Sequence, residues 1–511
     1  MPETVEMLLF QSNFSLNEKL AERTAITRTV TVGIVIVILV IAAALGIYLA
    51  ASSSHSTTTT GLSTTSTTQT TQSSFAYPVV TNVPQNLTDA FYPSTPVTLA
   101  MYEWSGIPPQ YMIQQFEAAF PNIHIQSTPN QDVSGLLSAL DTHQHVYDGF
   151  RVLYSLLPQE VSTGEVMNVG PWFNQYLGYL KQQITPAAFK LVSAGKTGAM
   201  YCMPEDFAPV ALDYRADIFA KYGLTVPTTW AQFAQDAAKL HSENSSIYMT
   251  IFPPNEPSSD LMALFSQGGG NMIVPAGNNS WNVVINSTKN INVINFWGNL
   301  ISAGSVTAMN LYTPQYDKML TEGQIASFVT AAAWYPGYLI EPTAPKEAGL
   351  WRVANMPQWN STGPFVSGQI SASCIGVTAN SVNPRATFLY AFYTTQTPQV
   401  LPWMWVNEGQ WTSNTYNLAN LKYPNGSSVF LSNSSYFGGQ DIGQVYLYAQ
   451  EHMPTQWVWS PFQITIQTIL QEQITEAAAG QITFASALQN TETIMIQYVQ
   501  SSGGTVVGVG H

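Results

Sequence analysis

Residues 201–240 constrain the fold more than any other stretch, because turn and cap residues divide them into a strand and two helices in a fixed order. Residues 208–214 form an apolar run of strand length. Residues 216–222 follow as a short helix that ends at Gly223, since glycine tolerates the left-handed backbone of a helix end. Thr229 is the N-cap of a second, amphipathic helix. A strand followed by helices in this way predicts an α/β fold.

The same alternation of strand and helix patterns continues along most of the chain. It begins near residue 97, where Val97, Leu99 and Met101 alternate with polar residues as in a half-buried strand. From residue 461 the pattern is helical. With 511 residues the chain exceeds what one core accommodates, so the sequence predicts two or three domains with α/β layers. The further strand-like segments are 247–252, 283–285, 325–331 and 370–377.

The chain carries unusually few charges for a globular protein. Asp, Glu, Lys and Arg make up 9% of it, against about 25% in a typical domain, so Ser, Thr, Asn and Gln must form much of the polar surface. The net charge is −14. Because nucleic-acid binding needs clustered Lys and Arg, we expect no nucleic-acid partner. A low-charge surface of this kind suits an acidic exterior, where carboxylates are protonated.

The N-terminal part has the pattern of a membrane anchor. Residues 29–51 contain no charged side chain, and as a helix they span about 34 Å, enough to cross a bilayer. Arg28 is followed by no Lys or Arg until Arg151, so the positive-inside rule places residues 1–28 in the cytoplasm and the later chain outside the cell. We therefore expect a single-pass protein of the cell membrane. A cleavable secretory signal and an archaeal class III signal remain alternatives.

Residues 52–95 are predicted to form a disordered stalk. Between residues 52 and 74, 18 of 23 residues are Ser or Thr, and such a tract cannot bury enough apolar surface to become ordered. Asn-x-Ser/Thr sequences follow, as expected for an exported glycoprotein, although chance supplies some of them in an Asn-rich chain. They begin at Asn86, Asn244, Asn278, Asn286, Asn360, Asn425 and Asn433.

Catalytic and metal-binding motifs are largely missing. His143 and His145 lie close in sequence, but no Cys, Asp or Glu stands beside them at ligand spacing, so they indicate a solvated segment. No G-x-S-x-G motif occurs. Glu205 and Asp206 are adjacent carboxylates, whereas a glycosidase needs two carboxylates about 5–10 Å apart across a bond. We expect no enzyme activity, no metal and no cofactor.

Several segments resemble, in the same order, the family 1 extracellular solute-binding proteins of ABC importers, the maltose-binding-protein-like group, in its archaeal membrane-anchored sugar-binding form. Residues 201–240 are similar to the first segment that crosses between the lobes of such proteins, and 97–123 to their first strand and helix. Residues 320–334 and 366–386 resemble the later "helix, Gly, strand, Trp" and second crossing segments. The similarity covers residues 96–500.

The resemblance implies a two-lobed periplasmic-binding-protein-like fold with hinge crossings. Lobe 1 would contain residues 96–206 and 371–455, and lobe 2 residues 207–370 and 456–503. The chain would cross between the lobes near residues 204–207, near residues 368–372 and near the start of the C-terminal helices.

The resemblance further implies a receptor that binds a neutral mono- or oligosaccharide between the lobes and delivers it to the permease subunits of the transporter. Pyranose rings stack on aromatic faces and hydrogen bond to carboxylates and amides. No Lys or Arg adjoins the aromatic candidates in sequence, which favours a neutral ligand. The implied ligand contacts are Glu103, Trp104, Glu205, Asp206, Trp334, Tyr335, Gln369, Trp457 and Trp459.

Two questions stay open. Cys202 and Cys374 lie beside the two segments that resemble neighbouring crossing strands, so a disulfide between them and two buried free thiols are both compatible with the sequence. The alternative functions are a structural or adhesive cell-surface glycoprotein, which the stalk also suits, and a surface glycoside hydrolase using Glu205 or Asp206.

Overall fold

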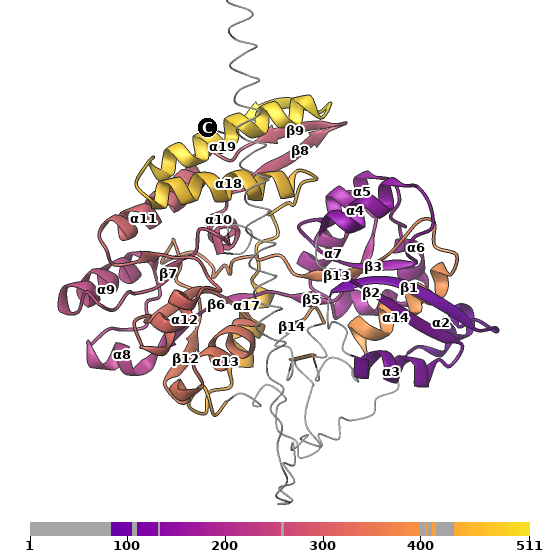
Figure 1. The fold of residues 1–511 in the computed structure, drawn as a ribbon, viewed down its shortest axis with the longest axis horizontal. Coiled ribbons are helices and arrows are strands. Elements are labelled where there is room, and N and C mark those ends of the chain that lie inside the picture. The colour runs from indigo at the N-terminus through magenta and orange to yellow at the C-terminus, as the bar shows by residue number, and fades with distance from the viewer. Residues whose placement is uncertain are drawn as a thin grey trace, which may run out of the picture. The chain divides into compact units, whose positions relative to one another are not determined.

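The computed structural model describes residues 83–104, 110–130, 133–256, 260–397, 404–405, 411–414 and 434–510, which form two α/β lobes (Figure 1). The predicted cytoplasmic segment 1–28, the predicted membrane helix 29–51 and most of the predicted stalk lie outside these residues. Among the helices of the described ranges, none combines the length and the apolar character needed to cross a bilayer.

Lobe 1 is built on a five-stranded sheet. β1 is parallel to its neighbours β2 and β3, whereas β13 is antiparallel to both β3 and β4. The carboxyl ends of β1, β3 and β4 and the first residue of β13 therefore share one edge of the sheet. In order across the sheet, the strands are β2 (Ile123–Asn130), β1 (Val97–Trp104), β3 (Gly149–Leu153), β13 (Ser373–Val377) and β4 (Cys202–Pro204).

Helices cover the sheet of lobe 1, and the longest of them, α14 (Pro384–Gln396), is almost entirely buried. It packs against β13 and also against α3 and α2. The other helices of this lobe are α2 (Gln85–Phe91), α3 (Gln110–Ala119), α4 (Val133–Asp141), α5 (Leu157–Ser162), α6 (Gly170–Tyr176) and α7 (Pro186–Val192).

Helix α2 corrects the predicted stalk, which we expected to extend to residue 95. Leu87 and Phe91 stand four residues apart, on one face of the helix, and both are buried. The Phe91 ring packs on the rings of Trp172 and Phe388. This short apolar face makes α2 part of the core of lobe 1.

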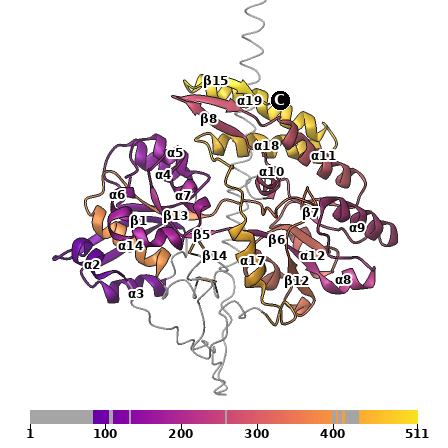
Figure 2. The ribbon, with the colours of Figure 1, turned by 180° about the vertical axis from the view of Figure 1, so that it is seen from behind.

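Lobe 2 contains three small sheets (Figure 2). In the central one, β6 (Val210–Arg215) lies between β11 (Ser327–Ala332) and β12 (Trp351–Ala354), antiparallel to both, and β11 is buried along its whole length. The two other sheets pair β7 (Ile251–Phe252) with β10 (Thr307–Ala308), and β9 (Ser280–Val283) with β8 (Ile273–Gly277) and β15 (Thr505–Val509).

The helices of lobe 2 pack around these sheets. At the C-terminal end of the chain, α18 and α19 pack against each other, and α19 also contacts α11 and β9. The helices are α8 (Ala216–Lys221), α9 (Trp230–Glu243), α10 (Met262–Gln267), α11 (Thr288–Ser302), α12 (Pro314–Thr321), α13 (Glu341–Thr343), α17 (Ile442–Glu451), α18 (Gln463–Ala478) and α19 (Phe484–Ser501).

The strand and helices predicted from residues 201–240 are confirmed. Gly223 ends α8 with a positive φ of 57°. Thr229 accepts a hydrogen bond from the backbone N–H of Gln232, and the Gln232 side chain reaches back to the N-cap, so the capping box of α9 is complete. The buried face of α9 carries Trp230, Phe233, Ala237 and Leu240.

Three connections join the lobes and lie side by side. The first runs from β4 through β5 (Asp206–Phe207) to β6, and the second leads into β13. An isolated bridge pairs Pro209 of the first connection with Gln369 of the second. The third contains β14 (Trp411–Thr412), which pairs with β5. We call residues 204–209, 369–373 and 411–414 the crossing junction.

Helix α17 lies in lobe 2, whereas residues 371–455 were expected in lobe 1. It packs on β6 and β12, and the Tyr446 hydroxyl donates a hydrogen bond to Asp213 of β6 at 3.0 Å. The backbone N–H of Gly349 likewise donates to the Tyr436 carbonyl. The third connection therefore ends before residue 436, earlier than expected, because the buried face of α17 matches the surface of the lobe 2 sheet.

Cys202 and Cys374 form a disulfide, which decides between the two possibilities that the sequence left open. Their Cα atoms are 5.7 Å apart on the neighbouring strands β4 and β13, and both residues are fully buried. Because β4 leads into the first connection and β13 follows the second, the disulfide fastens both connections to lobe 1.

Candidate functional site

The crossing junction is the region where the structure brings chemically distinct side chains together. Backbone pairing orders it: Phe207 lies opposite Trp411, and Asp206 lies opposite Thr412. The backbone N–H of Ser413 donates to the Glu205 carbonyl at 3.1 Å. The carboxyl ends of the lobe 1 strands also reach this region, and in open α/β sheets ligands bind outside those ends.

A buried ionic network occupies the lobe 1 side of the junction. The Arg151 guanidinium of β3 and the Glu103 carboxylate of β1 are both 0% exposed, and Arg151 Nη2 lies 3.5 Å from Glu103 Oε1. Arg151 also forms an ion pair with Glu205. The Tyr390 hydroxyl of α14 donates to Glu103 at 3.0 Å. Glu103 and Glu205, both expected as ligand contacts, are thus held inside lobe 1 by partners of this chain.

Asp206 completes the network at the junction. The Ser373 hydroxyl lies 2.9 Å from Glu205 Oε2 and also contacts an Asp206 carboxylate oxygen, which the Ser373 backbone N–H reaches as well. The Tyr154 hydroxyl donates to the Asp206 carbonyl at 3.2 Å. Asp206 is half-buried, so it is the most accessible of the three carboxylates.

Burial is the main cause of the raised pKa values in this network. Burial raises the pKa of the Glu103 carboxyl to about 7, while Arg151 and Tyr390 oppose that rise. Burial, and then the charge of Glu205, raise the pKa of Asp206 to about 7, against the hydrogen bonds from Ser373. Perturbed carboxyl groups of this kind gather at functional sites as well as in structural networks.

Trp334 and Tyr335, which follow β11, form an aromatic pair on lobe 2 with ring centroids 4.5 Å apart. The Tyr335 hydroxyl donates to Asp260 at 3.3 Å, and the Thr330 hydroxyl binds the same carboxyl. Burial raises the pKa of Asp260 to about 7, so this carboxyl also retains a proton at mildly acidic pH. Tyr335 is buried, whereas Trp334 is only partly buried, which makes Trp334 the ring of this pair that a ligand can reach.

Trp457 and Trp459 precede α18 and are 1% and 4% exposed, with ring centroids 5.4 Å apart. They line a cavity of about 170 Å³ together with Pro158 and with α7 residues of lobe 1, among them Lys190 and Leu191. The cavity therefore has walls from both lobes. Lys190 also contacts the Thr455 carbonyl. Its place beside these tryptophans could not be predicted, because it is far from them in the sequence.

Gln369 of the second connection lies close to this aromatic segment through a shared partner. Its backbone N–H donates to the Ser266 hydroxyl at 2.9 Å, and the Gln456 side chain donates to the Ser266 carbonyl at 3.2 Å. Ser155 is tied to the same connection, because its backbone N–H donates to the Ser371 hydroxyl at 3.0 Å. Gln369 and Ser155 are both buried.

Four buried polar groups in this region lack a hydrogen-bond partner among the described residues. They are the indole N–H groups of Trp457 and Trp459, the side-chain amide nitrogen of Gln369 and the Ser155 hydroxyl. Buried polar groups without partners are rare in folded proteins, so a cluster of donors calls for an acceptor. A ligand rich in oxygen atoms that enters between the lobes would supply these acceptors.

Three of the expected ligand contacts, Gln369, Trp457 and Trp459, are buried, and the rings of the two tryptophans pack together. Trp104 is the last residue of β1, at the same edge of the sheet. Arg151 was missed, although a lone arginine inside the apolar strand 149–153 indicates a buried ion pair. The remaining missed residues, Ser155, Lys190, Ser373 and Tyr390, carry no pattern in sequence.

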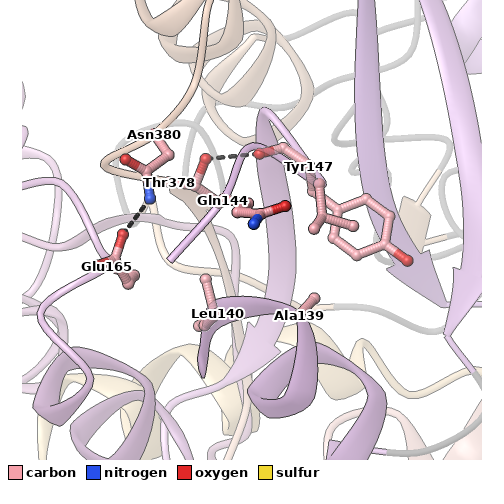
Figure 3. A pocket seen from close by; sticks show the side chains of 8 residues that line it. Ala139, Leu140, Gln144, Tyr147, Glu165, Thr378 and Asn380 are labelled. Atoms are coloured by element: carbon pink, nitrogen blue, oxygen red, sulfur yellow. Dashed lines mark hydrogen bonds between the residues drawn. The ribbon is translucent and has the colours of Figure 1, made fainter. Parts of the chain in front are cut away.

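A second cavity, on lobe 1, does not have the properties of a ligand site. Figure 3 shows its lining, in which Thr378 bonds to the Tyr147 carbonyl and Glu165 to Asn380, so these side chains already have partners. Its volume is about 10 Å³, which is no more than one water molecule needs. In the described ranges no three His, Cys, Asp or Glu side chains are grouped as metal ligands.

Solved structures of solute-binding proteins share this fold. The galacto-N-biose-/lacto-N-biose I-binding protein of an ABC transporter from Bifidobacterium longum matches with a TM-score of 0.68 at 20% identity, over 81% of this chain and 100% of that chain. A binding protein from B. animalis subsp. lactis, in complex with β-1,6-galactobiose, gives a TM-score of 0.65 at 20% identity, with the same coverage. The sugar-binding protein MalE from Xanthomonas citri gives 0.66 at 15% identity, over 80% and 98% of the two chains.

At the level of sequence, no curated protein matches the chain. Residues 106–431, more than half of the chain, match the family of bacterial extracellular solute-binding proteins. The match includes most of lobe 1, lobe 2 up to β12, and the described residues of all three connections. The chain therefore belongs to the bacterial extracellular solute-binding protein family.

Proposed function

We propose that this protein is the extracellular receptor of an ABC importer, which captures a neutral mono- or oligosaccharide between its two lobes and delivers it to the permease subunits. Family membership supports the receptor role. Two of the similar proteins were solved in complex with lacto-N-biose and with β-1,6-galactobiose, which favours a carbohydrate here. The proposal includes no enzyme activity, since the role needs binding and release alone.

The observation that carries the carbohydrate proposal is the cavity with walls from both lobes that Trp457 and Trp459 line, whose buried indole N–H groups have no partner among the described residues. A sugar presents hydroxyl and ring oxygens that accept hydrogen bonds, and a C–H face that stacks on an aromatic ring. Each buried donor left without an acceptor costs free energy, so a ligand that supplies acceptors is favoured. A purely apolar ligand would leave these donors unsatisfied.

We further assign different roles to the residues that the sequence singled out. Trp334, Gln369, Trp457 and Trp459 are the proposed ligand contacts, because they are aromatic or carry free donors. Tyr335 packs against the Trp334 ring, and its hydrogen bond to Asp260 holds it in place. Glu103, Glu205 and Asp206 position the junction, since their carboxylate oxygens are engaged by residues of lobe 1.

The same proposal includes attachment to the membrane through residues 29–51, with residues 1–28 in the cytoplasm and the lobes outside. It also predicts which Asn residues carry glycans. Asn278 and Asn360 are exposed. The Asn244 side-chain amide, in contrast, donates to the Tyr222 hydroxyl. We expect glycans at the exposed positions, and glycopeptide mass spectrometry would show them.

A thermal-shift screen of the full chain tests the receptor proposal against its rivals. The ligand panel contains neutral saccharides, polyols, peptides and inorganic phosphate. A rise in Tm confined to one or a few saccharides supports the proposal. Turnover of a chromogenic glycoside would instead show a hydrolase, and no shift with any compound would favour a structural surface glycoprotein.

A further inference from the structure

Glu205 and Asp206 contact all three connections between the lobes. They belong to the first connection, and Ser373, which both carboxylates contact, follows the second. The third connection pairs with them through Thr412, opposite Asp206, and through the backbone N–H of Ser413, which donates to the Glu205 carbonyl. The two carboxylates therefore lie where a change in charge reaches all three connections.

The hydrogen bonds at this place leave a position for one more proton. The Ser373 hydroxyl carries a single hydrogen, yet its oxygen contacts both the Glu205 and the Asp206 carboxylates. When both are ionised, that hydrogen serves one of them, and the other faces the lone pairs of the hydroxyl oxygen. A proton on one carboxyl removes this conflict, because that carboxyl then donates to Ser373 while Ser373 donates to the other.

We propose that Glu205, Asp206 and Ser373 form a proton-binding site that links the three connections, and that release of the proton loosens the hinge between the lobes. The proposal rests on the proposed receptor function, in which the lobes close on a ligand, and it adds regulation of that closure by pH. These residues act on the ligand through the hinge, and so they are positioning residues.

The charged and titratable groups around the site act in opposite directions. Arg151 of β3 is the cation that pairs with Glu103 and Glu205, so two carboxylates share it, and its charge opposes protonation of Asp206. The phenol groups of Tyr154 and Tyr390 also face the network and remain neutral, since burial raises their pKa values further. Burial and the charge of Glu205 raise the pKa of Asp206 to about 7.

The sign of the effect follows from the direction of that shift. An unfolded Asp titrates near pH 3.9, so the folded site with a raised pKa binds the proton more tightly than the unfolded chain does. The stabilisation of the hinge is complete below about pH 4 and is lost as the pH rises through about 7. A receptor with this site closes best in an acidic medium, in agreement with its low surface charge.

Hydrogen–deuterium exchange of the ligand-free full chain tests the proposal locally, after correction for the intrinsic rate at each pH. We expect exchange in peptides covering 204–209 and 369–373 to be faster by up to roughly 100-fold at about pH 8.5 than at about pH 5, as expected for a carboxyl whose pKa is raised from about 3.9 to about 7. We call this increase in exchange rate between the two pH values the step. Asp206→Asn should abolish the step, because asparagine does not titrate. If the wild-type protein shows no step in these peptides, the proposal is wrong.

Asp213→Asn is the matched control. Asp213 is also a buried aspartate, its pKa is raised well above the usual range by burial, and it bonds to Tyr446, but it lies in β6 outside the junction. We expect Asp213→Asn to keep the step in both peptides. If Asp213→Asn also loses the step, the step reflects a general effect of pH on the fold. Glu160 could produce such an effect, since its buried carboxylate has no hydrogen-bond partner among the residues that the structure describes.

Two further measurements keep the outcomes apart. Should Asp206→Asn fail to fold, Ser373→Ala removes the linking hydroxyl and should also abolish the step, whereas a retained step would refute the shared site. Sugar affinity, measured by calorimetry at the same two pH values, tests the coupling to ligand. The exchange experiment contains no ligand, so its result does not depend on finding a sugar that binds. If no sugar binds, the receptor function is contradicted, and the proton-binding site is still tested by exchange.

Discussion

Replacing Arg151 with methionine should destabilise the protein strongly at neutral pH and much less at acidic pH. Arg151 is 0% exposed and is the partner of both Glu103 and Glu205. Methionine has a similar length and fills the space, so the main effect of the substitution is the loss of the positive charge. Removing one partner of a buried ion pair costs about 3–5 kcal/mol, because it leaves an uncompensated buried charge.

The pH dependence distinguishes this effect from a loss of packing. Burial raises the pKa of Glu103 to about 7 in the presence of Arg151, and without the guanidinium it should rise further. At about pH 4.5 Glu103 is then neutral, so its part of the cost falls to that of lost hydrogen bonds, about 1–3 kcal/mol. The predicted difference between the two pH values is therefore about 2 kcal/mol.

Urea unfolding followed by tryptophan fluorescence at both pH values measures this difference. Arg215→Met is the control, since Arg215 lies on β6 of lobe 2 and pairs with Glu347 and with Asp217, whose side chain is 42% exposed. Water can reach Asp217, so the control should lose less stability and show a weaker dependence on pH. Equal destabilisation of Arg151→Met at both pH values would refute the electrostatic account.

Three other substitutions test separate parts of the structure. Replacing Cys202 and Cys374 with serine opens a loop with a sequence separation of 172, and chain entropy predicts a loss of about 3–5 kcal/mol in urea unfolding under oxidising conditions; an unchanged midpoint would contradict it. Tyr446→Phe leaves Asp213 without its hydrogen bond and should cost about 1–3 kcal/mol, less at acidic pH where Asp213 is protonated; a neutral effect at pH 7 would count against it. Trp334→Ala should weaken ligand binding by about 2–3 kcal/mol, or roughly 30- to 150-fold, with little change in Tm, whereas a large fall in Tm with normal affinity would place this ring in the core.

Local patterns in the sequence sufficed where one segment decides its own structure. The capping box at Thr229 and the glycine at 223 define α9 and α8 because caps and turns depend on neighbours in the chain. The crossing strands were located through resemblance, and the disulfide between Cys202 and Cys374 followed as one of two possibilities. These features need no knowledge of distant contacts beyond the order of the segments.

Contacts between distant segments account for what the sequence left out. Helix α17 lies in lobe 2 because Tyr446 reaches Asp213, residues that are separated by most of the domain. The carboxylates of Glu103 and Glu205 look like ligand contacts in sequence, but the fold places Arg151 between them. No residue near either glutamate in the chain indicates that Arg151 is its partner, so these ion pairs could be identified only in the structure.

The most direct test of the central claim is isothermal titration calorimetry of the full chain with the saccharides that raise its Tm, on the wild-type protein and on Trp459→Ala. The account predicts saturable binding of one sugar per chain, and a loss of roughly 10- to 100-fold in affinity in the variant, because a buried ring and its free N–H donor are removed. Binding that is unchanged in Trp459→Ala would contradict the proposed site, and no saccharide binding by the wild-type protein would contradict the proposed function.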